Sequence, residues 1–122
     1  MVTNAVIQYP WKPVLEQPSA DYESQFRSCV MHNVRMAQAF VSAMPERRWG
    51  RVIGINRECA MQCWPNQSAH VAGKRGRGGA LRVLAQEEVG PMGVTVNQIA
   101  PSWTASENRP DQASPLWYLD GT

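Results

Sequence analysis

Short, apolar, β-branched runs alternate in this chain with long stretches of helical periodicity, and this alternation limits the fold more than any other feature. The runs lie at residues 2–8, 50–56 and 93–101, and the helical stretches at 21–44 and 68–88. Strands that alternate with helices favour a parallel sheet with right-handed crossovers. The sequence therefore predicts an α/β fold with about three parallel strands and two long helices. At least one sheet edge stays open unless another chain covers it.

The first helical stretch, residues 21–44, carries its apolar residues at three- and four-residue steps. Ser19 or Asp21 is placed to cap its start, and Pro45 is placed to end it. Two segments that contain prolines, 9–20 and 57–67, are expected to be connecting loops.

The stretch SAHVAGKRGRGGALRVLAQE, residues 68–87, admits two interpretations. Its middle is basic and glycine-rich, as in a loop that binds phosphate, whereas its flanks have helical periodicity. A P-loop needs Gly-Lys followed by Ser or Thr after a strand, but here Lys74 precedes Arg75 and no strand comes before it. We therefore predict a helix that Gly90 and Pro91 end, weakened by interior glycines that each cost about 0.5–1 kcal/mol relative to alanine.

Composition argues against several classes of function. The net charge of +2 does not by itself imply a nucleic-acid partner, although ten of the twelve cations are arginine, which suits bidentate contacts to carboxylate or phosphate. No run approaches the roughly 20 apolar residues of a membrane span, and no signal peptide is visible. Three cysteines, an odd number, favour free thiols in a reducing, cytoplasmic setting. Cys59 and Cys63 do not have the paired spacing of a zinc site, so no metal is expected.

Several segments resemble, in order and spacing, the central and C-terminal half of a short-chain dehydrogenase/reductase. TNA resembles the Asn-Asn-Ala-Gly turn after the family's fourth strand, and WGRVIGIN resembles the fifth strand. QSAHVAGK resembles the helix that carries the Tyr-x-x-x-Lys motif. EVGPMGVTVNQIAPSW resembles the sixth strand and the Pro-Gly that follows it. The resemblance covers roughly residues 2–106 and implies a partial Rossmann-like sheet. We expect a truncated domain over residues 1–106 and a poorly ordered tail over 107–122.

The resemblance assigns the family's catalytic Asn, Ser, Tyr and Lys to Cys29, Arg57, His70 and Lys74, of which only Lys74 matches. In the family, tyrosine exchanges the proton while hydride moves, lysine lowers the pKa of that tyrosine, and serine orients the carbonyl. A helix puts His70 and Lys74 on one face, and nearby cations lower the pKa of a histidine. The changed set predicts loss of catalysis. A repurposed site, with neutral His70 as the base of an oxidation, is the alternative.

The same resemblance implies NAD or NADP as the cofactor. Its contacts would come from Asn4, Ala5, Lys74, Pro101, Ser102 and Thr104. The family holds the pyrophosphate at a glycine-rich turn after its first strand, and no such pattern occurs in this sequence. We expect a dinucleotide to lose most of its usual contacts.

The sequence thus predicts a relative of NAD(P)-dependent oxidoreductases of alcohols and carbonyls that is inactive alone. One alternative is an assembly or regulatory module, which pairs with a second copy or a related chain through the open sheet edge or the helices. In the family the two long helices form a dimer interface, although Arg77 stands at a usually apolar position. The other alternative is a weak anion or nucleic-acid binder that uses Arg57, Lys74, Arg75, Arg77 and Arg82.

Overall fold

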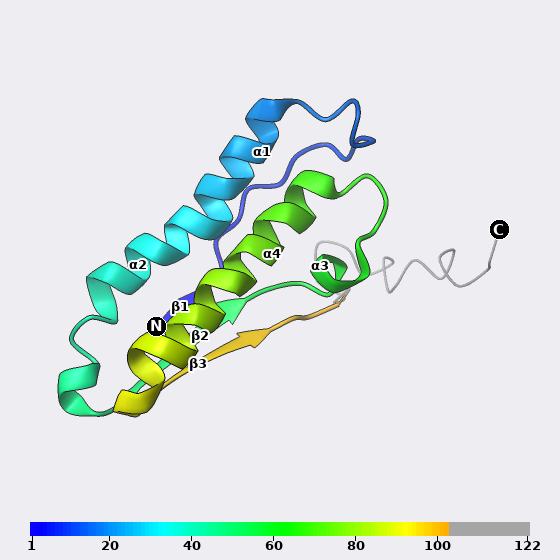
Figure 1. The fold of residues 1–122 in the computed structure, drawn as a ribbon. Coiled ribbons are helices and arrows are strands. Elements are labelled where there is room, and N and C mark those ends of the chain that lie inside the picture. The colour runs from blue at the N-terminus through cyan, green and yellow to red at the C-terminus, as the bar shows by residue number, and fades with distance from the viewer. Residues whose placement is uncertain (103–122) are drawn as a thin grey trace, which may run out of the picture.

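Three parallel strands form one sheet in the order β1-β2-β3, and the long helices lie side by side over one of its faces (Figure 1). The computed structural model describes residues 1–102, save the side chain of Glu87. The predicted α/β fold, with three parallel strands and two long helical stretches, is confirmed. The tail predicted over residues 107–122 lies outside the described residues.

The strands are β1 (Val2–Thr3), β2 (Gly50–Ile55) and β3 (Val94–Ile99). β2 is the central strand: Ile53 pairs with Val2 on one side, and Val52 pairs with Val96 on the other. Burial alternates along β2, since every second residue from Gly50 faces the helices. The helices therefore bury one face of the sheet in the described residues.

The first helical stretch is continuous, and it consists of α1 (Ser19–Phe26), a π-helical segment η1 (Arg27–Met31) and α2 (His32–Phe40). The predicted caps are wrong, because Pro18 occupies the N-cap position without a side-chain hydrogen bond. The predicted end at residue 44 is also wrong. Pro45 lacks the N–H that would continue the helix to the Val41 carbonyl, and the Met44 N–H bonds that carbonyl instead, at 2.9 Å.

The glycine-rich stretch forms α4 (Ser68–Val83), so the helix interpretation is confirmed and the phosphate loop is excluded. A π-helical segment η3 (Leu84–Val89) and a 3₁₀ turn η4 (Gly90–Met92) follow it. A second 3₁₀ turn, η2 (Pro45–Arg47), precedes β2. The loop predicted over 57–67 contains one helical turn, α3 (Cys59–Gln62), which is too short to leave a periodic pattern in the sequence.

The hydrophobic core lies between the sheet and the two helical stretches. Its buried residues are Val41, Val52, Leu81, Val89 and Val94. Gly73 brings α4 against η1, because a Cβ there would lie 3.2 Å from Cβ and 3.3 Å from Sγ of Cys29. This close approach fixes the position of the α4 face that carries the candidate site residues.

Candidate functional site

The carboxyl ends of the three strands meet at one edge of the sheet, and predicted site residues follow each of them. The Asn56 N–H donates to the Ile99 carbonyl at 2.7 Å, and the Glu58 N–H donates to the Pro101 carbonyl at 3.2 Å, which ties the segments after β2 and β3 together. Four predicted cofactor positions lie exposed at or near this edge: Asn4, Ala5, Pro101 and Ser102. Thr104 lies outside the described residues.

His70, Lys74 and Arg77 share one face of α4, because they follow one another at steps of four and three residues. The Lys74 ammonium donates to the Ile55 carbonyl at 2.9 Å, and Nη1 of Arg77 donates to the same carbonyl. Lys74 is only 3% exposed and Arg77 is 0% exposed. Two buried cations therefore converge on the last carbonyl of β2.

The electrostatic cost of this arrangement appears in both side chains. Burial, and then the neighbouring Arg77, lower the pKa of Lys74 from 10.5 to about 8. Burial also lowers the pKa of Arg77. Within the described residues, Nη2 of Arg77 is buried and has no hydrogen-bond partner. The charged groups that act on Lys74 include no carboxylate of residues 1–102, so the pair is not neutralised by an acidic side chain there.

His70 occupies the first turn of α4 and borders a small cavity. Its Nε2 atom is buried and makes no hydrogen bond to the described residues. Burial is the main cause that lowers the pKa of His70 from 6.5 to about 4, and the charges of Lys74, Arg57 and Arg77 lower it further. His70 is therefore a neutral imidazole near pH 7, as the cations near it led us to expect.

Cys29 lies on η1, is 0% exposed and packs against Gly73. Its thiol contacts the Gln25 side-chain oxygen at 3.4 Å, and it does not border the cavity. Of the four predicted catalytic positions, the structure places Arg57 and His70 at one cavity and Lys74 one helical turn beyond His70. Cys29 lies nearer to Arg77, whose Nε contacts the Cys29 main-chain carbonyl at 3.5 Å.

Sequence reasoning missed one buried polar residue of this region and misplaced a second. Asn33 donates to the Cys29 carbonyl at 2.6 Å and accepts from the Thr3 hydroxyl, so it links η1 and α2 to the end of β1. Arg77 was assigned to a helix surface, whereas it points inward. Its spacing of three residues from Lys74 indicates that the two side chains share one helix face. The spacing does not indicate that this face is buried, because an arginine without a nearby acidic residue is rarely found in a core.

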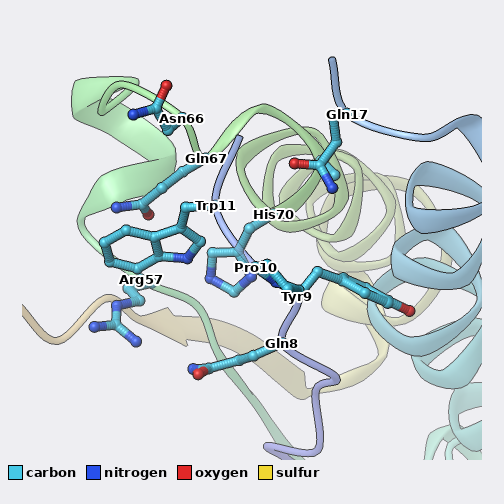
Figure 2. A pocket seen from close by; sticks show the side chains of 10 residues that line it. Gln8, Tyr9, Pro10, Trp11, Gln17, Arg57, Asn66, Gln67 and His70 are labelled. Carbon is cyan, nitrogen blue, oxygen red and sulfur yellow. The ribbon is translucent and has the colours of Figure 1, made fainter. Parts of the chain in front are cut away.

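The cavity has a volume of about 20 Å³, and three parts of the chain line it: residues 8–11 with Gln17, Arg57, and residues 66, 67, 69 and 70. Figure 2 shows the Arg57 guanidinium, the Trp11 indole and the His70 imidazole around it, and the Tyr9 hydroxyl points away from Arg57. Polar donors and an aromatic wall thus face a space the size of one water molecule or one ligand atom.

The fit of these residues to a nicotinamide dinucleotide is poor. In the family pattern a lysine binds the ribose with its ammonium, but here that ammonium is buried and donates to Ile55. The exposed residues Asn4, Ala5, Pro101 and Ser102 offer contact area at the sheet edge without a built phosphate cradle. The arrangement does not present the lysine to a ribose, and we derive no reaction step through the cofactor.

Other predictions about the site concern metal, membranes and a basic surface. In residues 1–102, no group of three His, Cys, Asp or Glu side chains comes together as metal ligands do. Every helix in that range is too short or too polar to span a bilayer. The proposed basic surface on α4 is not formed as expected, because Lys74 and Arg77 are buried and Arg75 donates to the carbonyls of Ala60 and Met61.

The family model described as short chain dehydrogenase matches residues 1–116. D-beta-hydroxybutyrate dehydrogenase of Rhizobium meliloti (strain 1021) is 29% identical over 117 residues, which cover 93% of this chain and 45% of the relative. A 3-oxoacyl-[acyl-carrier-protein] reductase of Pseudomonas aeruginosa is 36% identical over 69 residues, 57% of this chain and 28% of the relative. The chain therefore spans less than half the length of these relatives.

Solved structures have the same fold. A halohydrin dehalogenase bound to ethyl (2S)-oxiran-2-ylacetate superposes with a TM-score of 0.80 at 22% identity, over 93% of this chain and 48% of that one. Acetoin dehydrogenase from Enterobacter cloacae superposes with a TM-score of 0.75 at 24% identity, over 99% of this chain and 44% of that one. The three-stranded sheet and its helices thus correspond to about half of a larger α/β fold.

Proposed function

Because the chain belongs to the short-chain dehydrogenase/reductase family, we propose that it is a member whose own residues do not perform the family's hydride-transfer reaction. Its relatives by sequence include dehydrogenases and reductases of hydroxy and oxo compounds. The chain therefore resembles oxidoreductases in sequence. By the chemistry of its site it lacks the groups that move the proton.

The observation that carries this proposal is the state of His70, which stands at the family's tyrosine position. A carbonyl that accepts hydride needs a proton donor within reach of its oxygen. The pKa of His70 is about 4, so the imidazolium that could donate that proton is scarce near neutral pH. The neighbouring cations oppose the protonation of an imidazole, whereas a neutral tyrosine hydroxyl already carries the proton that it donates.

Lys74 and Arg57 support the same conclusion. The Lys74 ammonium donates to the Ile55 carbonyl at the end of β2 and is buried there, so it is not exposed to a ribose at that edge. Arg57 puts a charged guanidinium at the cavity where the family has a small neutral hydroxyl. Each change removes one function that the reaction requires.

A turnover assay on the purified chain tests the proposal. NADH and NADPH oxidation is followed with a 3-oxoacyl thioester, and NAD reduction is followed with acetoin and with D-β-hydroxybutyrate. These compounds represent the substrate classes in the names of the relatives. The expected result is no turnover above the rate without protein.

The Lys74→Ala variant, purified in parallel, is the control for a contaminating dehydrogenase. Activity that is present in the wild-type chain and absent in Lys74→Ala would overturn the proposal. Activity that is equal in both preparations belongs to a contaminant.

A second candidate function is pairing with another copy through the helices. A groove of about 420 Å³ runs between α2 and α4, and apolar residues line most of it, among them Val34, Ala37, Leu81 and Leu84. Phe26 and Phe40 are also exposed on the same helical layer. Exposed apolar area of this kind is typical of an interaction surface.

A further inference from the structure

The cavity beside His70 has the chemistry of an anion site rather than of a carbonyl site. We propose that it binds the carboxylate group of a small organic acid, with the Arg57 guanidinium as the counter-charge. This inference rests on the proposed function in one respect, namely that Arg57 and His70 are not parts of a hydride-transfer relay.

The charge around the cavity favours an anionic ligand. Arg57 borders the cavity directly, and Lys74 and Arg77 lie behind His70 on the same helix face. Among the described residues, the charged groups that act on His70 are Lys74, Arg57 and Arg77, all of them cations. A carboxylate placed there gains from three positive charges in a partly desolvated setting. A neutral carbonyl gains much less.

The hydrogen-bond donors point to the same class of ligand. Nε2 of His70 is buried without a partner in the described residues, and in the tautomer with its proton there it donates. The first turn of α4 borders the cavity at Ala69 and His70, where helical N–H groups have no intrahelical acceptor. The N-cap residue Gln67 makes no side-chain capping bond, so those donors are not satisfied by a cap.

The walls of the cavity narrow the class of anion. Its innermost space, about 20 Å³, holds one oxygen atom of an anionic head group. The Trp11 indole and Pro10 form an apolar wall beside Arg57 (Figure 2), against which a short hydrocarbon tail packs. The fitting ligand is therefore a small monocarboxylate with a short apolar tail, such as butyrate.

Isothermal titration of the intact chain with butyrate tests this inference, and butyramide serves as the neutral ligand of the same shape. We expect butyrate to bind with a dissociation constant of about 1 mM or below, as suits so small a ligand, and butyramide to bind at least about tenfold more weakly. Phosphate and chloride, titrated separately, are expected to bind more weakly than butyrate. Binding of butyrate should also shift the imidazole resonances of His70 in an NMR spectrum of the labelled chain.

Two arginine variants locate the site. Arg57→Gln removes the charge but keeps donors, and it should weaken butyrate binding by about tenfold or more, because a charge-assisted hydrogen bond is lost. Arg82→Gln removes an exposed arginine elsewhere on the same helix and should leave the affinity within about twofold. Arg57→Lys keeps the charge but loses the bidentate contact, so it should bind butyrate more weakly than the wild-type chain and more tightly than Arg57→Gln, and it tests the site if Arg57→Gln does not fold.

Several results would overturn the inference: equal affinity for butyrate and butyramide, unchanged butyrate binding in the Arg57 variants, no shift at His70, or tighter binding of phosphate or chloride. None of these results bears on hydride transfer, which the turnover assay measures separately. Conversely, turnover that depends on Lys74 would overturn the proposed function and leave the butyrate titration to be judged by itself.

Discussion

His70 gives the folded chain a specific dependence of stability on pH. The pKa of His70 is about 4 in the folded state and 6.5 when unperturbed, so between pH 4 and pH 6.5 the unfolded chain binds a proton that the folded chain does not bind. Stability therefore falls as pH drops from 6.5 toward 4, and this contribution is fully present above pH 6.5.

We expect the free energy of unfolding of the wild-type chain, measured by urea titration, to fall between pH 7 and pH 4.5 by more than that of His70→Gln. His32→Gln, which removes the other histidine outside the cavity, should keep the wild-type loss. If the free energy of unfolding falls equally in the wild-type chain and in His70→Gln, His70 is not the group that causes the loss.

Arg77 is a buried cation that costs stability. Its acceptors keep other donors when it is removed, because Lys74 still bonds the Ile55 carbonyl and Asn33 still bonds the Cys29 carbonyl. We expect Arg77→Met to be neutral or to raise the free energy of unfolding by about 1–3 kcal/mol, since an apolar side chain of similar length replaces a desolvated charge. The pKa of Lys74 should rise in the same variant.

Chemical denaturation of Arg77→Met beside Arg82→Met measures this effect. The exposed position 82 should change stability by no more than about 0.5 kcal/mol. A loss above about 1 kcal/mol in Arg77→Met alone would mean that the guanidinium stabilises the fold.

The site residues divide into those that sequence reasoning could place and those that it could not. The spacing of His70 and Lys74 on one helix, and the position of Arg57 after a strand, follow from local pattern and resemblance. The inward direction of Arg77 depends on the rotation of α4 about its axis, which Gly73 and Gly54 set through close packing. Such packing is a tertiary property that no local pattern contains.

At the scale of elements, two glycines of α4 differ in whether the neighbouring helix leaves room for a side chain. A Cβ added at Gly79 meets nothing within 4 Å, whereas one added at Gly76 lies 2.9 Å from Cγ2 of Val30. We expect Gly79→Ala to raise the free energy of unfolding by about 0.5–1 kcal/mol, the usual gain inside a helix. Gly76→Ala should gain less or destabilise, because the methyl group presses on η1.

Thermal unfolding of the two variants side by side checks this expectation. The same substitution on the same helix makes each variant the control of the other. A larger gain for Gly76→Ala than for Gly79→Ala would contradict the close packing of α4 on η1.

Element types could be predicted in this chain, and several boundaries could not. β2 and β3 were recognisable from their β-branched runs, and the two helical stretches from their period. The early end at Phe40 depends on one missing hydrogen bond at Pro45, although the apolar period runs on to Met44. The segments η1 and η3 have the i→i+5 hydrogen bonds of a π-helix over little more than one turn, which is too short to set a period of its own in the sequence.

At the scale of the whole molecule, the groove between α2 and α4 predicts self-association. We expect light scattering after size-exclusion chromatography to show a dimer at high protein concentration. Leu84→Glu should shift it toward the monomer, because a carboxylate in an apolar interface is costly to desolvate. Val83→Glu, at an exposed neighbouring residue outside the groove, is the matched control and should remain dimeric.

A chain that stays monomeric at high concentration would contradict pairing through this surface. Equal dissociation of both variants would place the interface elsewhere. Circular dichroism of each variant separates a lost interface from a lost fold.

We propose that this chain keeps about half of its family's fold without the arrangement that binds and uses a nicotinamide dinucleotide. Calorimetric titration of the intact, mass-verified chain with NADH and with NADPH tests it most directly. Because the Lys74 ammonium is buried and donates to the Ile55 carbonyl, we expect no binding at millimolar concentrations of either dinucleotide. Micromolar binding of NADH or NADPH that Lys74→Ala weakens would contradict it.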